Sequence, residues 1–204
     1  MKRGLPCLIA LGLVILLSAC ASKPRTTASG EVPRVSWQQH QRIVNGLEQW
    51  MLTARVSVKT RDKAWSGKVH WQQQGGQYHI QFSAPFGQGA FRLDGSPAGV
   101  EMQLADGEAY VSTDAETLIF EQLGWRFPLG GLRYWVKGVP DPSLSPVLSF
   151  DEDGRLATLK QTHWRISYPD YLQVGKLFLP RKVYLQNTEL SVRLVIDQWE
   201  LHGV

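Results

Sequence analysis

Cysteine is almost absent from this chain: Cys7 and Cys20 are the only two among 204 residues. Cys7 lies in an N-terminal segment that we predict below to be removed, which leaves Cys20 as the one thiol of the mature chain. A disulfide framework needs cysteines in pairs, and a catalytic thiol must lie within the fold. The sequence therefore excludes disulfide-stapled folds and cysteine catalysis.

Motifs for catalysis, metal binding and nucleotide binding are also missing. No pair of histidines has the His-Glu-x-x-His spacing of a zinc site, and no Gly-x-Ser-x-Gly nucleophile turn occurs. The segment Gly87-Gln88-Gly89 lacks the third glycine and the following helix of a dinucleotide fingerprint. The acidic run Asp151-Glu152-Asp153-Gly154 is interpreted as a hairpin turn rather than a calcium site. We predict a protein that is not an enzyme and holds no cofactor or metal.

An excess of charge of one sign is lacking as well. The formal net charge is +4 at pH 7, and it falls to +2 when Lys2 and Arg3 are removed with the N-terminal segment. Nucleic-acid binding through phosphates needs clustered basic residues, whereas the charges here are spread evenly along the chain. We therefore expect no nucleic-acid partner.

The first twenty residues have the features of a secretory signal. Lys2 and Arg3 precede an apolar run from Leu5 to Leu17. This run is shorter than the roughly 18 to 20 residues that span a bilayer, which argues against a transmembrane anchor. It ends in Leu17-Ser18-Ala19-Cys20, which resembles the lipobox of bacterial lipoproteins. The resemblance implies cleavage after Ala19 and lipidation of Cys20.

The rest of the chain is predicted to form one domain on a tether. Residues 21–34 are small and polar and contain proline and glycine, as is typical of a flexible linker. We therefore predict a signal peptide over residues 1–19, a lipidated N-terminus and tether over 20–34, and a single domain over 35–204. That length is sufficient for a real hydrophobic core.

After the tether, the hydrophobic periodicity changes from that of a helix to that of strands. Ser36 is placed to cap a helix that runs to about Glu48. From Trp50 onward, apolar residues occupy every second position, as in a half-buried strand. Such segments are predicted over 50–58, 65–71, 78–82, 91–93, 100–104, 156–159, 164–168, 177–185 and 190–196, with breaks at Gly75-Gly76, Gly95-Ser96-Pro97 and Asp106-Gly107. They form successive antiparallel hairpins.

Two short helices interrupt these strands. Thr113 and Glu116 have capping-box spacing, which predicts a helix that begins there. Pro128 begins a second predicted helix that extends to Val136 and is ended by Gly138 and Pro140. Apolar residues on these helices are expected to face the sheet as a lid: Leu118, Ile119, Leu132 and Trp135.

The simplest architecture for these elements is mainly β with an α lid. We predict a half-closed antiparallel β-barrel of about eleven strands, whose helices cover a concave hydrophobic face. The periodicity alone leaves open whether this face is solid core or encloses a cavity. The candidates for a cavity lining are the inward residues Trp50, Leu52, Val56, Trp65, Val69, Trp71, Tyr78, Ile80, Phe82, Phe91, Leu93, Met102, Leu104 and Trp164.

One turn differs from the others in carrying a large apolar residue. Pro85-Phe86-Gly87 joins the strand that ends at Phe82 to the strand that carries Phe91. Proline and glycine favour a protruding turn with Phe86 near its tip. Phe86 either folds back onto the rim of the sheet or remains exposed, and an exposed apolar tip is suited to contact a lipid or a hydrophobic partner.

Several of these segments together resemble the LolB family of outer-membrane lipoprotein receptors. They are the lipobox, Trp37-Gln38-Gln39-His40-Gln41, Trp71-Gln72-Gln73, Pro85-Phe86-Gly87 and the run 128–138, PLGGLRYWVKG. The order and spacing match over essentially the whole chain. The resemblance implies a lipid-anchored protein of the outer membrane that faces the periplasm of a Gram-negative bacterium.

The resemblance also implies a function, partners and a role for the loop. Members of that family accept lipoproteins from the periplasmic carrier LolA and insert them into the inner leaflet of the outer membrane. The expected partners are thus LolA, the acyl chains of the cargo and that leaflet, and the protein is expected to be a monomer. The family typically has leucine at the loop tip, where this chain has Phe86, so the hydrophobic character needed for insertion is kept.

Two other classes of function fit the residues without the resemblance. A lipid-anchored scaffold with a solid barrel would explain the lipobox, the tether and the aromatic residues equally well. A carrier of a free small lipid would need the cavity but no protein cargo. Cross-linking from the inward positions and mass spectrometry of retained lipid would discriminate among the three.

Overall fold

The computed structural model describes residues 36–85 and 89–202. These lie within the second of two compact units into which the chain divides, Val35–Val204. The predicted signal peptide, Cys20 and the tether lie outside the described residues, as do Phe86 and Gly87. In the described part of the chain, no helix has both the length and the hydropathy required to cross a bilayer.

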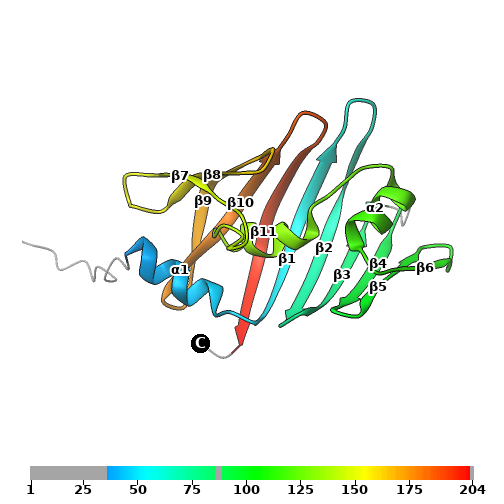
Figure 1. Ribbon diagram of the computed structural model, residues 1–204, viewed down its shortest axis with the longest axis horizontal. Coiled ribbons are helices and arrows are strands. Elements are labelled where there is room, and N and C mark those ends of the chain that lie inside the picture. The colour runs from blue at the N-terminus through cyan, green and yellow to red at the C-terminus, as the bar shows by residue number, and fades with distance from the viewer. Residues whose placement is uncertain (1–35, 86–88, 203–204) are drawn as a thin grey trace, which may run out of the picture. The chain divides into compact units, whose positions relative to one another are not determined.

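Eleven antiparallel strands form a single open sheet (Figure 1). Their spatial order is β6-β5-β4-β3-β2-β1-β11-β10-β9-β8-β7. Strands that are adjacent in the sheet are therefore consecutive in the sequence, except for the pair β1 and β11. The strands are β1 Gln49–Lys59, β2 Ala64–Gln74, β3 Gln77–Ser83, β4 Phe91–Ser96, β5 Gly99–Leu104, β6 Ala109–Ser112, β7 Val147–Phe150, β8 Leu156–Gln161, β9 Trp164–Val174, β10 Leu177–Gln186 and β11 Ser191–His202. The predicted half-closed sheet is confirmed, and β6 and β7 remain its two unjoined edges.

Alternation of buried and exposed residues along the strands confirms the predicted period of two. In β1, the side chains of Trp50, Leu52, Ala54, Val56 and Val58 are buried while the residues between them are more exposed. The turn at 151–154 is confirmed as the β7–β8 hairpin, where the Asp151 backbone N–H donates to the Arg155 carbonyl at 2.9 Å. Strand β4 runs through Gly95 to Ser96 and so includes the first two residues of the break predicted at Gly95-Ser96-Pro97.

Three helices accompany the sheet: α1 Trp37–Asn45, α2 Ala115–Leu123 and α3 Leu129–Trp135. Ser36 caps α1 as predicted, by accepting a hydrogen bond from the Gln39 backbone N–H, but the helix ends three residues before Glu48. The predicted capping residue of α2, Thr113, is wrong by one position. Asp114 is the N-cap, because its carboxylate accepts from the Thr117 backbone N–H at 2.8 Å.

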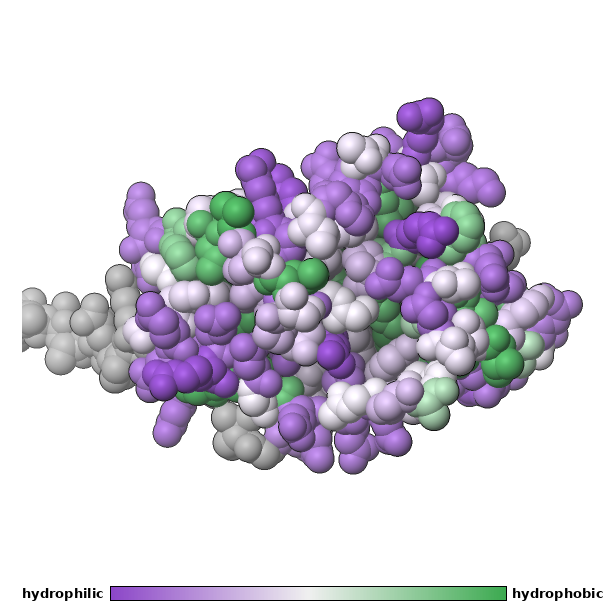
Figure 2. Space-filling model, in the orientation of Figure 1, coloured by the Kyte–Doolittle hydropathy of each residue, from purple (hydrophilic) through white to green (hydrophobic). Residues whose placement is uncertain are grey.

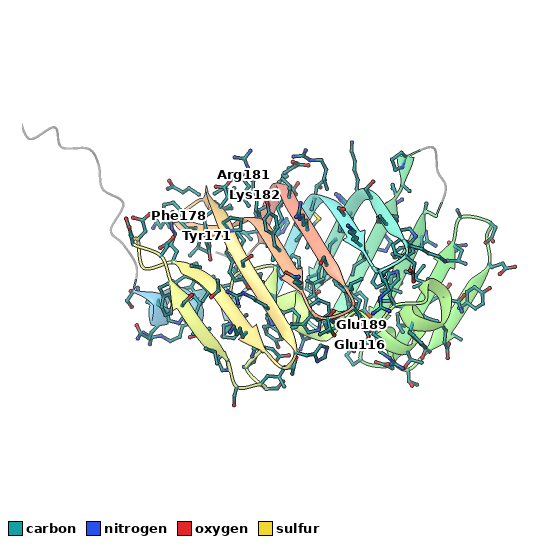
Figure 3. All side chains as sticks on the ribbon, turned by 90° about the horizontal axis from the view of Figure 1, so that it is seen from above. Glu116, Tyr171, Phe178, Arg181, Lys182 and Glu189 are labelled. Atoms are coloured by element: carbon teal, nitrogen blue, oxygen red, sulfur yellow. The ribbon has the colours of Figure 1, made fainter. Side chains whose placement is uncertain are left out.

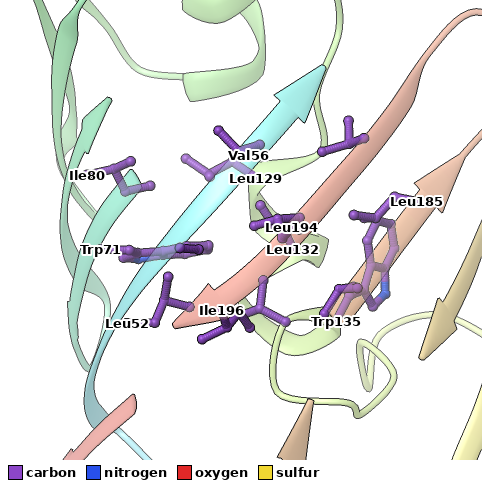
Figure 4. Close-up of a cluster of buried hydrophobic side chains, with 14 of the residues drawn as sticks. Leu52, Val56, Trp71, Ile80, Leu129, Leu132, Trp135, Leu185, Leu194 and Ile196 are labelled. Atoms are coloured by element: carbon purple, nitrogen blue, oxygen red, sulfur yellow. The ribbon is translucent and has the colours of Figure 1, made fainter. Parts of the chain in front are cut away.

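The segment that contains α2 and α3 crosses one face of the sheet (Figure 1). Figure 3 shows the molecule from above, with Arg181 and Lys182 on the side of the sheet opposite to Glu116 of α2. The hydrophobic core therefore lies between the inner face of the sheet and the covering helices, as burial on one face of each strand requires. Figure 4 shows side chains from β1, β2, β3, β10, β11 and α3 gathered in this core.

Three tryptophan residues form a cluster in the core. The Trp50 ring centroid lies 5.0 Å from that of Trp71 on β2 and 5.6 Å from that of Trp199 on β11. Each of these side chains is at least nine-tenths buried. Contacts at these distances stabilise aromatic pairs by about 0.5–1.5 kcal/mol beyond their burial. Since β1 pairs with both β2 and β11, this cluster holds the centre of the sheet together.

Candidate functional site

An apolar cavity of about 150 Å³ lies between the sheet and the segment that covers it. Strands β1, β2, β3, β4 and β11 supply one wall, and α2, α3 and the connection between them supply the other. All the lining residues are apolar: Val56, Val58, Trp65, Val69, Trp71, Ile80, Phe82, Gly89, Phe91, Leu93, Ile119, Leu123, Trp125, Phe127, Leu129, Leu132, Val192 and Leu194. The cavity can shelter hydrocarbon from water, and its walls bring no carboxylate, imidazole or ammonium group to it.

Eight of the fourteen residues predicted for a cavity lining do line it: Val56, Trp65, Val69, Trp71, Ile80, Phe82, Phe91 and Leu93. The other six are not among its lining residues: Trp50, Leu52, Tyr78, Met102, Leu104 and Trp164. Leu52 and Met102 are core residues with exposures of 1% and 0%. Among the predicted lid residues, Ile119 and Leu132 line the cavity, while Leu118 and Trp135 are buried beside it.

Eight lining residues were not predicted: Val58, Gly89, Leu123, Trp125, Phe127, Leu129, Val192 and Leu194. Val192 and Leu194 lie on the inward face of β11, and the alternation of the predicted strand over 190–196 was sufficient to place them there. Trp125 and Phe127 lie in the connection between α2 and α3, which has no repeating pattern. The available signal that these two residues belong to a site was the presence of large apolar side chains in a segment of turns.

We use the word cover for residues 115–135, which comprise α2, the connection 124–128 and α3. At its start, the Asp114 carboxylate accepts hydrogen bonds from the Thr117 hydroxyl and backbone N–H, and these bonds lower the pKa of Asp114. Burial, and then the charge of Asp114, raises the pKa of Glu116 in the first turn. Gly124 ends α2 with a φ of 80°, a conformation that favours glycine.

The far end of the cover is held by a buried glutamine. The Gln161 side-chain oxygen accepts from the Trp135 indole N–H at 2.8 Å and from the Asp141 backbone N–H at 2.9 Å. Its amide nitrogen donates to the carbonyls of Asp141 and Leu144, both at 2.9 Å. Gln161 is 1% exposed, and its bond with Trp135 is fully buried, while the three bonds with the backbone are partly buried. They tie α3 and the segment after it to β8.

A buried lysine joins the same region to α1. The Lys137 ammonium donates to the carbonyls of Val44 at 3.1 Å and Leu47 at 3.3 Å, at the end of α1. It also lies 6.0 Å from the Trp50 ring centroid and 5.8 Å from that of Tyr134. Burial, and then the positive charge of Arg133, lowers the pKa of Lys137 to about 8.

Beside the apolar cavity lies a more polar depression of about 920 Å³, which we call the outer groove. The β1–β2 turn, the end of α2 and the β10–β11 turn form it: Lys59, Thr60, Arg61, Asp62, Lys63, Trp65, Phe120, Leu123, Gly124, Trp125, Arg126, Gln186, Asn187, Thr188, Glu189, Leu190 and Ser191. Figure 2 shows that hydrophilic side chains dominate the face of the molecule seen there and that hydrophobic ones appear in separate areas.

No group of three or more histidine, cysteine, aspartate or glutamate side chains in the described part of the chain is arranged to hold an ion. Since the cavity walls are hydrocarbon, the chemistry that they offer is the exclusion of water from an apolar ligand.

An open antiparallel sheet with a helical cover over an apolar cavity defines a class of fold whose two layers enclose an apolar interior. Solved structures share this fold. A LolA superfamily protein from Nitrosomonas europaea matches with a TM-score of 0.53 and 8% identity, over 83% of this chain and 95% of that chain. At that identity the likeness concerns the fold alone.

Sequence relatives identify the family. The model of the family described as outer membrane lipoprotein LolB matches residues 48–199. The outer-membrane lipoprotein LolB of Nitrosococcus oceani is 38% identical over 95% of this chain and 96% of its own length. That of Pseudomonas savastanoi pv. phaseolicola is 34% identical, with 94% of each chain covered. The chain belongs to the LolB family of outer-membrane lipoproteins, which confirms the resemblance seen in its motifs.

Proposed function

We propose that this protein is a lipid-anchored receptor that accepts lipoproteins from the periplasmic carrier LolA and releases them into the inner leaflet of the outer membrane. The observation that carries the proposal is the cavity with wholly apolar walls in a member of the LolB family. Transfer of this kind makes and breaks no covalent bond, so the proposal requires no catalytic group. The protein would act as a monomer.

The physical need for such a receptor follows from the cost of exposing an acyl chain to water. A chain with about fifteen methylenes costs on the order of 12 kcal/mol to expose, at about 0.8 kcal/mol per methylene. Cargo with several chains would therefore not cross the periplasm unprotected. Transfer without a nucleotide would proceed down a series of affinities, from the carrier to the receptor and then to the membrane.

The size of the cavity requires the cover to move when cargo enters. A cavity of about 150 Å³ holds a ligand the size of benzene, which is much smaller than an acyl chain. The strands that form the other wall are joined by ladders of backbone hydrogen bonds, whereas the cover is hydrogen-bonded to the sheet at its far end, through Trp135 and Gln161. We infer that α2, α3 and their connection shift away from the sheet to admit acyl chains.

The ends of the transfer pathway are assigned to residues outside the described part of the chain. Cys20, with its lipid, would hold the receptor at the outer membrane through the tether of residues 20–34. Phe86 would enter the bilayer and promote release of the cargo. The described residue next to it, Pro85, is exposed at the end of the segment that follows β3, as an insertion loop requires.

A charge placed in the cavity tests the receptor site. Leu93 is 1% exposed and lines the cavity, so Leu93→Glu should abolish acceptance of acylated cargo from the carrier by a form of this protein that lacks its own lipid. Phe91→Glu alters a half-buried lining residue and provides a variant with a smaller folding cost. Val111→Glu, at a position 78% exposed on β6, is the matched control and should accept cargo normally. Normal acceptance by folded Leu93→Glu and Phe91→Glu would refute the site.

The insertion step is tested separately. Phe86→Glu should accept cargo from the carrier but fail to deliver it to liposomes. Gln88→Glu introduces the same charge into the same loop without removing the aromatic ring, and it should deliver cargo at close to the normal rate. Full delivery by Phe86→Glu would contradict the role proposed for the loop tip.

The other two classes of function predict different ligands for the cavity. A small-lipid carrier would retain a lipid through purification, which extraction and mass spectrometry would detect. A scaffold with a solid interior would give no labelling of acylated cargo from a photo-crosslinker at position 93. Labelling of cargo from that position supports the receptor.

A further inference from the structure

Trp125 lies where the apolar cavity and the outer groove meet. It lines both of them, as do Trp65 and Leu123. Its ring centroid lies 6.1 Å from that of Trp65 on β2 and 5.6 Å from that of Phe127 in the cover. The indole is therefore placed at the boundary between a hydrocarbon compartment and a polar one.

The indole nitrogen of Trp125 is buried and lacks a hydrogen-bond partner. In the described part of the chain, only two buried side-chain polar atoms are left without one, Trp125 Nε1 and Tyr168 Oη, and only Trp125 lines the cavity. Two other buried indoles have acceptors: Trp71 donates to the Gln73 side chain at 3.1 Å and Trp199 to the Pro180 carbonyl at 3.0 Å. A buried donor without an acceptor is unfavourable in a native protein, so this position needs an explanation.

We propose that Trp125 Nε1 donates a hydrogen bond to the carbonyl at the head of a bound acyl chain. In an acylated lipid, an ester or amide carbonyl stands between the methylenes and the polar head. With the methylenes in the apolar cavity, widened by the shift of the cover, and the polar portion in the outer groove, that carbonyl would lie at the boundary that Trp125 lines. The inference rests on the proposed function and adds a specificity-determining residue to it.

This bond would give the site a preference that hydrocarbon walls lack. Apolar walls bind an alkyl chain and an acyl chain by the same exclusion of water. A single buried donor at the mouth distinguishes them, because only the acyl chain supplies an acceptor that satisfies it. The same bond would also fix how deeply the chain enters the cavity.

The test compares two synthetic ligands. One is an S-diacylglyceryl cysteinyl-serine dipeptide with ester-linked chains, and the other is its dialkyl counterpart with ether links of the same length. The protein without its own lipid should bind the ester form about 2- to 12-fold more tightly, the range that one net hydrogen bond provides. Trp125→Phe keeps the aromatic ring but removes the N–H, so it should reduce this ratio to about one.

Trp71→Phe is the matched control. Trp71 also lines the cavity, but its indole N–H already donates to Gln73. Removal of that N–H should therefore leave the ester-to-ether ratio unchanged. Equal binding of the two ligands by the unaltered protein, or the same reduced ratio in both variants, would overturn the role of Trp125. Binding of neither ligand by the unaltered protein would instead refute the proposed function, and the two failures are thus distinguishable.

A second measurement does not depend on the variants. In the unaltered protein labelled with ¹⁵N at tryptophan, the Trp125 indole N–H resonance should shift downfield with the ester ligand and less with the ether ligand. The same shift with both ligands would overturn the proposal.

A further pair of titrations uses diester and diether phosphatidylglycerol, and it distinguishes a carbonyl of the cargo from one of a membrane lipid. If the ester dipeptide binds more tightly than diester phosphatidylglycerol, the site is assigned to cargo.

Discussion

Replacement of Lys137 should change the pH dependence of stability in a predictable direction. Lys137→Met keeps an unbranched side chain of similar length in a site that is 4% exposed, while it removes the ammonium that donates to the Val44 and Leu47 carbonyls. Two opposing effects follow at pH 7. Loss of the donors is destabilising by about 1–3 kcal/mol, whereas removal of a buried charge is stabilising.

The magnitude comes from the difference between the pKa of Lys137 in the folded and unfolded chains. The folded value is about 8 and the ordinary value is 10.5, a difference equivalent to about 3 kcal/mol. Between these values the unfolded chain binds more protons than the folded one, so the free energy of unfolding rises with pH. From pH 7 to pH 9.5, Lys137 should contribute a rise of about 2 kcal/mol.

The assay is urea unfolding of both proteins at pH 7 and pH 9.5. At pH 7 the two free energies of unfolding should be similar, because the effects of the lost bonds and the lost charge nearly cancel. The free energy of unfolding of the unaltered protein minus that of Lys137→Met should be about 2 kcal/mol larger at pH 9.5 than at pH 7. Taking the difference cancels the titration of the tyrosines and other groups. A difference that does not change with pH, or that changes in the opposite direction, would refute this reasoning.

Two further predictions concern the packing around the cover and the sheet. Gln161→Leu should lower the free energy of unfolding by about 2–5 kcal/mol in urea titrations, because Trp135 and three backbone groups lose their buried partner; a loss below 1 kcal/mol would contradict it. Gly95→Ala should destabilise by about 1–3 kcal/mol, since its methyl group would overlap the Tyr78 ring, whereas Gly130→Ala, in an open helical position of α3, should stabilise by about 0.5–1 kcal/mol. Thermal unfolding of the two glycine variants shows whether they change stability in opposite directions.

The long strands of this fold were predictable because one of their faces is buried. In β1, apolar side chains recur at every second position, and this pattern alone placed Leu52 and Val56 among the inward residues. The edge strands β6 and β7 were not predicted. They are four residues long, and their exposed residues include Val111 and Val147, so the pattern of a half-buried strand does not develop.

The site was predictable only in part, for a related reason. A repeating pattern assigns a residue to a face of the sheet, but it does not say which part of that face is filled. Met102 and Leu93 pair across β4 and β5 and are both buried, yet only Leu93 lines the cavity. The position of the cover decides which of the two residues lines the cavity. Trp125 belongs to a segment without periodicity, and its unsatisfied indole nitrogen is visible only in three dimensions.

The unjoined edges of the sheet have a mechanical consequence. In a closed barrel the ladder of backbone hydrogen bonds fixes the circumference, so the interior cannot widen unless some of those bonds break. Here β6 and β7 end the sheet without pairing to each other, so a change of twist can move the two edges apart while every ladder remains intact. A change of twist is therefore available to widen the interior without unfolding any part of the sheet, in addition to the proposed shift of the cover.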